Sequence, residues 1–158
     1  MGGLGGSGIG ALIAKNWFYD KCSTPIEAVA DYHLPTYINR KTLVILNSYS
    51  GNTEETLSMF EEAKAAGCHI IIITSGGKLK ELAEANNLHT YPLNGGYQPR
   101  MTIGFGLSYL LMIIGISISL AAQQVIPSVI ITLLFLVWLS HYLRRLLCFL
   151  LTLDIKKF

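Results

Sequence analysis

The stretch TLVILNSYSGNTEETLSMFEEAKAAGCHIIIIT, residues 42–74, decides the fold of this chain. Its two ends, 42–47 and 69–74, are short and continuously apolar, which is typical of strands buried on both faces of a sheet. The β-branched residues of the second run favour a strand over a helix. Between them, residues 53–66 repeat apolar side chains at helical spacing, and Gly67 stands where a helix C-cap is expected. A strand, a helix and a strand in so short a unit predict a parallel sheet.

Further elements of the same kind flank this unit. A helical stretch is expected over 9–16, another over 78–86, and a weaker third strand over 89–93. Strands that alternate with helices in short units are typical of a sheet covered by helices on both faces. The sequence therefore predicts an α/β fold, a doubly wound parallel sheet between helices.

Composition excludes some classes of partner. The chain has 158 residues, enough for one domain with a real core. Its net charge is +2, and no basic face is dense enough to predict a nucleic-acid partner. Three widely spaced cysteines predict free thiols in a reducing compartment, and the glycine-rich start lacks the basic region of a signal peptide. We therefore expect a cytoplasmic protein.

Residues 101–158 follow a different pattern, with long apolar stretches and few charges. On length alone, residues 103–122 could span a bilayer. For 103–116 we favour a helix packed in the core, whereas 125–151 fits a core helix and a membrane span equally well. Association with a membrane through 103–151 is thus the alternative to a cytoplasmic location.

Serine, threonine and glycine gather where the predicted helices begin, in residues 2–10 (GGLGGSGIG), 47–53 (NSYSGNT) and 74–77 (TSGG). Loops at the carboxyl ends of parallel strands open into a common crevice. Glycine lets the backbone approach a ligand closely, and the amides of a helix N-terminus suit an anion. We therefore predict that the hydroxyls of Ser48, Ser50 and Thr53 bind a phosphate or a polyol.

Two other patterns in these loops do not predict a ligand site. Asn52 is expected to cap the helix that follows, with Glu55 at the third helical position as in a capping box. Gly3, Gly5 and Gly8 match the dinucleotide-binding fingerprint, but that motif needs a strand before it and an acid at the end of the next strand. Neither is present, so we do not predict a dinucleotide site.

Two further residues, Arg100 and His33, carry charged or titratable side chains. Arg100 ends the segment NGGYQPR after the third strand, where a cation could bind a phosphate or stabilise an enediolate. The alternative for Arg100 is a solvated surface charge. His33, in DYHLP, is expected to be structural or to face solvent.

Five motifs give the chain a family resemblance: GGSGIG, DYHLP, TLVILNSYSGNTEETL, ITSGGKLKELA and GGYQPR. Over about residues 3–115 they resemble, in order and spacing, the bifunctional phosphoglucose/phosphomannose isomerases of the sugar isomerase (SIS) superfamily. The resemblance implies a five-stranded parallel sheet between helices. It also implies conversion of glucose 6-phosphate or mannose 6-phosphate to fructose 6-phosphate through an enediol, with no metal or redox cofactor.

The resemblance assigns roles to particular residues. Those implied to contact a phosphorylated hexose are Gly6, Ser7, Ser48, Ser50 and Thr53. Arg100 matches an arginine thought to stabilise the enediolate, which makes it the expected catalytic residue. The alternative function is a non-catalytic SIS module that binds a carbohydrate derivative.

The chain also departs from the family, which has two SIS domains in tandem and works as a dimer. The family's base glutamate, ring-opening histidine and a lysine lie in the second domain, and nothing after Arg100 matches them. We therefore expect a partial SIS domain over 1–120 that lacks the first strand of its sheet. Residues 121–158 are expected to form an apolar tail, helical or frame-shifted. We therefore expect the isolated chain to be catalytically incomplete. The expected protein partner is a second copy in a homodimer or a partner's second SIS domain.

Overall fold

The computed structural model describes residues 1–122, apart from the side chains of residues 99–100 and 120–122. The predicted helix or span over 125–151 lies outside this part. The chain divides into two compact units, Met1–Ile118 and Ser119–Phe158. The fold given below is that of the first unit.

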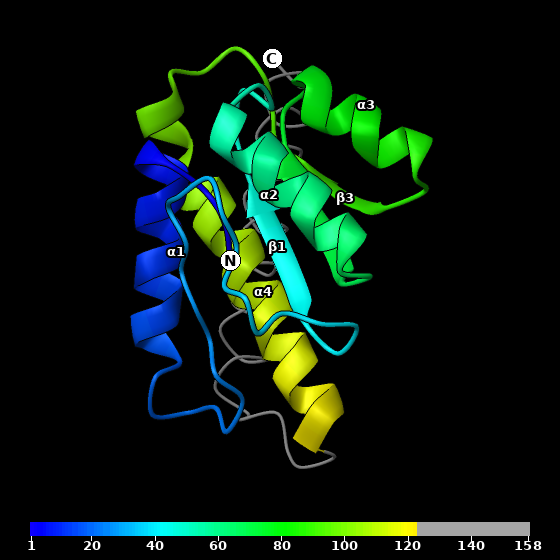
Figure 1. The fold of residues 1–158 in the computed structure, drawn as a ribbon. Helices are drawn as coiled ribbons and strands as arrows, with labels where there is room; N and C mark the ends of the chain where they lie inside the picture. Colours follow the sequence, from blue (N-terminus) through cyan, green and yellow to red (C-terminus); the bar gives the residue numbers. More distant parts are fainter. Residues whose placement is uncertain (123–158) are drawn as a thin grey trace, which may run out of the picture. The chain divides into compact units, whose positions relative to one another are not determined.

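Strands and helices alternate along the described chain, as the sequence predicts (Figure 1). They are α1 (Gly5–Trp17), β1 (Leu43–Asn47), α2 (Glu54–Ala65), β2 (His69–Thr74), α3 (Gly77–Ala85), β3 (His89–Pro92), the 3₁₀ turn η1 (Pro99–Thr102) and α4 (Ile103–Ala122). The strands are parallel in the order β1-β2-β3, with Leu43 opposite His69 and Ile71 opposite His89. The predicted α/β class is confirmed, with three of the five expected strands present in the described residues.

The outer edge of β1 is paired with Gly2 instead of a full strand. The Gly2 amide donates to the Ile45 carbonyl at 2.9 Å, and the Gly2 carbonyl accepts from the Asn47 amide at 2.9 Å. Gly2 also bridges Val29 on its other side. A single residue thus stands where the resemblance implies the first strand.

Helices cover both faces of the sheet (Figure 1). Because strand side chains alternate in direction, Val44 and Leu46 face one layer and Ile45 faces the other. Leu46 joins the cluster with α2 and α3, which includes Met59, Phe60, Ala63, Leu79 and Ala83. Ile45 joins the cluster with α1 and α4, which includes Ala14, Phe18, Leu110, Ile113 and Ile114. The core is therefore split into two layers by a sheet that is buried on both faces.

The first part of α4 is a core element. Leu110, Ile113 and Ile114 are buried against the sheet, which agrees with the core helix that the sequence predicts over 103–116. Of the helices in the described part of the chain, none is long and apolar enough to cross a membrane.

Candidate functional site

The carboxyl ends of β1 and β2 bring residues 48–53 and 74–77 into direct contact. The amide and the hydroxyl of Ser75 both donate to the Tyr49 carbonyl, at 3.1 and 2.6 Å. The Leu79 amide donates to the Gly51 carbonyl at 2.9 Å. Two of the three predicted loops therefore form one structure.

Two glycines make this close approach possible. Gly51 and Gly77 both have a φ of +69°, a left-handed conformation that L side chains rarely adopt. A Cβ at Gly51 would overlap the carbonyl oxygen of Gly76, and a Cβ at Gly77 would overlap that of Ser50. The backbones of the two loops thus touch at positions where only glycine fits.

The three predicted hydroxyls differ in their surroundings. Ser48 is buried, and its Oγ lies 3.0 Å from Oγ1 of Thr53 and accepts the Gly51 amide at 3.2 Å. Ser50 is exposed, and its Oγ accepts the Asn52 amide at 3.3 Å. The structure therefore brings Ser48 and Thr53 together, while Ser50 lies nearby on the solvent side. Ser48 also supports the loop itself.

The predicted capping box is wrong. The N-cap of α2 is Thr53, and the helix begins at Glu54, so Glu55 is the second helical residue rather than the third. The Asn52 carboxamide oxygen instead accepts the Lys78 amide, at 2.9 Å, in the first turn of α3. The left-handed turn at Gly51 directs Asn52 across to the next loop. No local pattern reveals a partner 26 residues away.

The N-termini of α1 and α2 are both left without a side-chain cap. Thr53 makes no capping hydrogen bond, and its hydroxyl faces Ser48 instead. Leu4, the N-cap of α1, has no capping group. Amides in the first turn of a helix have no acceptor within the helix, and they carry the positive end of its dipole. These two helix starts are therefore suited to an anion.

The first turn of α1 lies beside the end of β1. It contains the predicted residues Gly6 and Ser7, both half-buried. A Cβ at Gly3, just before the helix, would come within 2.7 Å of the Asn47 carbonyl oxygen. The Asn47 side chain is buried, and its Oδ1 has no hydrogen-bond partner in the described structure. The first loop and the 48–53 loop are thus neighbours at one edge of the sheet.

Two carboxylates share the N-terminus of α2. Glu54 and Glu55 lie in its first turn, where negative side chains stabilise the helix dipole. The Tyr32 hydroxyl lies 3.5 Å from Oε2 of Glu54, and the charge of Glu55 raises the pKa of Tyr32 above its ordinary value. These carboxylates reduce the positive potential that a bound anion would meet.

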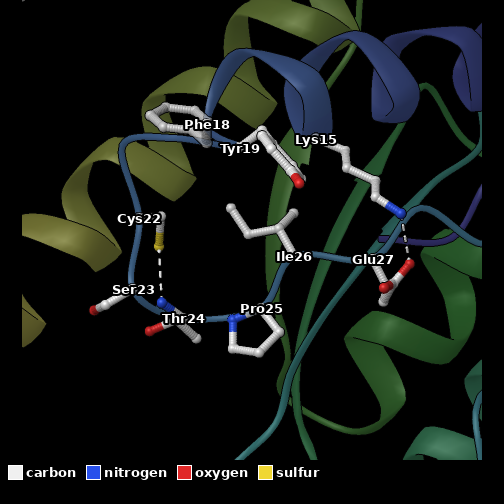
Figure 2. A pocket seen from close by; sticks show the side chains of 9 residues that line it. All are labelled: Lys15, Phe18, Tyr19, Cys22, Ser23, Thr24, Pro25, Ile26 and Glu27. Atoms are coloured by element: carbon white, nitrogen blue, oxygen red, sulfur yellow. Dashed lines mark hydrogen bonds and ion pairs between the residues drawn. The ribbon is translucent and has the colours of Figure 1, made fainter.

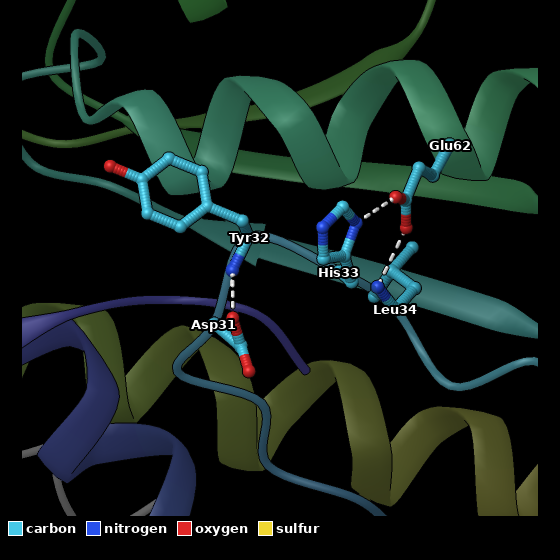
Figure 3. Close-up of polar contacts among 5 residues, drawn as sticks. All are labelled: Asp31, Tyr32, His33, Leu34 and Glu62. Atoms are coloured by element: carbon cyan, nitrogen blue, oxygen red, sulfur yellow. Dashed lines mark hydrogen bonds and ion pairs between the residues drawn. The ribbon is translucent and has the colours of Figure 1, made fainter.

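His33 has the structural, solvent-facing position expected for it, next to Glu62 on α2 (Figure 3). Its Nδ1 lies 2.6 Å from Oε1 of Glu62, in the third turn of α2, and the ring is exposed. Glu62 also accepts the Leu34 amide at 2.7 Å. The hydrogen bond raises the pKa of His33 and lowers that of Glu62. The pair holds the DYHLP segment against α2.

The position of Arg100 is described only through its backbone, in η1 (Pro99–Thr102). Its predicted role stays a prediction. The segment before it is held by Tyr49, a residue that the motif analysis missed. The Tyr49 hydroxyl bonds to Asn94 and Tyr97, 45 and 48 residues away, so nothing local in the sequence indicates it.

Two pockets lie away from the 48–53 loop. The larger, 320 Å³, lies at the end of α1 and the segment after it, and the Lys15–Glu27 ion pair of 2.8 Å stands at its side (Figure 2). The smaller, 180 Å³, lies beside the first turns of α1 and is mainly apolar. Within residues 1–122, no group of three His, Cys, Asp or Glu side chains is placed to hold a metal ion.

Comparisons with known proteins agree with this architecture. The SIS domain family matches residues 1–93. A bifunctional phosphoglucose/phosphomannose isomerase of Caldicellulosiruptor bescii is 50% identical over 111 residues, which are 70% of this chain and 33% of that protein. Its counterpart in Aquifex aeolicus is 45% identical over 115 residues, 72% of this chain and 36% of that protein.

A protein with a different named activity is also similar. The D-glucosamine-6-phosphate 4-epimerase of Sulfolobus acidocaldarius is 39% identical over 113 residues, which are 71% of this chain and 35% of that protein. This chain spans about a third of the length of the curated relatives it matches. Because the family match covers more than half of its residues and agrees with the parallel sheet between helices, the chain belongs to the SIS domain family.

Proposed function

We propose that this chain binds a phosphorylated hexose at the carboxyl edge of its sheet, with the phosphate at the N-terminus of α2. The observation that carries the proposal is the uncapped start of this helix, where Thr53 turns its hydroxyl to Ser48 and leaves the first-turn amides to a ligand. Support comes from the relatives, whose names specify phosphoglucose, phosphomannose and glucosamine 6-phosphate.

The proposed contacts divide between the two halves of the ligand. The phosphate accepts hydrogen bonds from backbone amides of residues 54–56 and from the hydroxyls of Ser50 and Thr53. Ser48 keeps Thr53 and the Gly51 amide in place. The sugar extends toward Gly6 and Ser7 at the start of α1, which lies beside the same strand end.

We further propose that the ligand is the substrate of an aldose–ketose isomerisation between glucose 6-phosphate or mannose 6-phosphate and fructose 6-phosphate. In the ring-opened aldose, a base removes the C2 proton and an enediolate forms. A proton then moves from O2 to O1 and the base returns a proton to C1, which leaves the ketone at C2. Arg100 stabilises the negative oxygen. Within the described residues, the carboxylates nearest the proposed phosphate are Glu54 and Glu55, in the first turn of α2, where they stabilise the helix dipole. We therefore propose that the base is supplied from outside residues 1–122.

Calorimetric titration tests the binding proposal. Glucose 6-phosphate should bind, and glucose should not, because the phosphate supplies the charge that the helix start attracts. Thr53→Val removes the hydroxyl while keeping the side-chain shape, and should weaken binding about tenfold or more, since hydrogen bonds to charged groups are worth about 1.5–3 kcal/mol. Ser58→Ala, farther along α2, is the matched control. Equal affinity of wild type and Thr53→Val would contradict the proposed phosphate site.

A turnover assay tests the proposal that the chain binds the substrate but does not convert it. The chain alone should bind glucose 6-phosphate without forming fructose 6-phosphate. Robust turnover by the chain alone, lost in Arg100→Ala, would show that the base lies within it and would refute this part of the proposal. Binding and chemistry are thereby tested separately.

A further inference from the structure

One hydroxyl holds the segment 94–97 in place. Oη of Tyr49 accepts the Tyr97 amide at 2.9 Å and donates to the Asn94 carbonyl at 3.2 Å. A phenolic hydroxyl can do both at once, because it has one donor and acceptor lone pairs. Between the two bonded groups lie Gly95 and Gly96, which are exposed and have open space where a side chain would stand. The turn is therefore held by the Tyr49 hydroxyl together with the Tyr97 ring, whose centroid lies 6.4 Å from that of Phe105.

Tyr49 is itself held in place by hydrogen bonds and by packing. Its carbonyl accepts two hydrogen bonds from Ser75, and its ring packs against the core cluster between the sheet and α4. In the chain it stands between Ser48 and Ser50, two of the hydroxyls of the candidate site. A movement of segment 94–97 relative to the phosphate loop would have to break bonds at this residue.

We propose that Tyr49 is a positioning residue, whose hydroxyl holds segment 94–97 as a preformed wall for the sugar half of the ligand. This inference rests on the proposed function. The phosphate meets backbone amides that do not depend on the Tyr49 hydroxyl, whereas the sugar extends toward the start of α1. Segment 94–97 leads into η1, which contacts α1. Holding segment 94–97 before binding removes the entropy loss of ordering it when the hexose arrives. Arg100 stands three residues beyond Tyr97 in the chain.

The test compares two ligands on Tyr49→Phe. Affinity for glucose 6-phosphate should fall about three- to tenfold, the range expected for one or two lost hydrogen bonds. Affinity for inorganic phosphate should change less than about twofold, because the phosphate loop keeps its backbone contacts. Tyr109→Phe is the matched control: its hydroxyl donates to the Pro92 carbonyl at 3.4 Å, outside the segment, and its loss should change neither affinity.

Amide hydrogen exchange without ligand supplies an independent readout. In Tyr49→Phe the Tyr97 amide should exchange about tenfold faster, since it loses its acceptor. Unchanged exchange at Tyr97, an unchanged affinity for glucose 6-phosphate, or an equal loss for both ligands would each overturn the positioning role. In these cases wild-type binding of glucose 6-phosphate would leave the proposed function intact. Failure of the wild type to bind that ligand would refute both proposals.

Discussion

The two ends of α1 differ in what surrounds them. At its C-terminal end, side chains enclose a 320 Å³ pocket with an ion pair at its side. At its N-terminal end, the start of the helix meets the loops at the carboxyl edge of the sheet, where glycine backbones touch and helix amides remain uncapped. We therefore place the proposed site by backbone geometry rather than by pocket size.

The substitution expected to have the largest effect on the sheet-edge loops is Gly51→Ala. The new Cβ would overlap the Gly76 carbonyl and force a non-glycine residue to a φ of +69°. Strain and overpacking together should lower the free energy of unfolding by roughly 3 kcal/mol or more. Gly95→Ala is the control, because open space surrounds that position. Urea unfolding of both variants measures the difference, and equal stability would show that the loops are not tightly packed.

The next largest effect on stability should distinguish Ser48 from Ser50 in the 48–53 loop. Ser48→Ala leaves the buried Gly51 amide without its acceptor and should cost about 1–3 kcal/mol of stability. Ser50→Ala removes an exposed hydroxyl and should change stability by less than about 0.5 kcal/mol. Urea unfolding again measures both. The reverse order would contradict the structural role assigned to Ser48.

The smallest effect on stability is expected for Glu27, beside the 320 Å³ pocket at the end of α1. The hydrogen bond from Lys15 holds the pKa of Glu27 below its ordinary value of 4.5. A lowered pKa contributes stability that is present above that ordinary value and is lost as the pH falls through the folded-state value. Glu27→Gln should therefore melt slightly below wild type near neutral pH, and the gap should close in acid. Its phosphate affinity should equal that of wild type; a lower affinity would bring the pocket into the site.

The sequence predicted the elements well because their causes are local. The apolar runs at 42–47 and 69–74 became β1 and β2 within one residue, and Gly67 has the positive φ expected just after α2. Prediction failed where a partner comes from far along the chain. Asn52 caps α3 instead of α2, and Tyr49 bonds to a segment more than 40 residues away. Such contacts follow from the packing of the loops, and no local sequence pattern indicates them.

The most direct test of the central claim follows the amide NMR shifts of the chain during titration with glucose 6-phosphate. If the phosphate binds at the start of α2, the largest shifts should occur at residues 50–56, with further changes at Gly6 and Ser7. The pocket segment 18–27 should stay unchanged. Shifts concentrated in 18–27, or no shifts at 50–56 at saturating ligand, would contradict the claim that the uncapped start of α2 receives the phosphate.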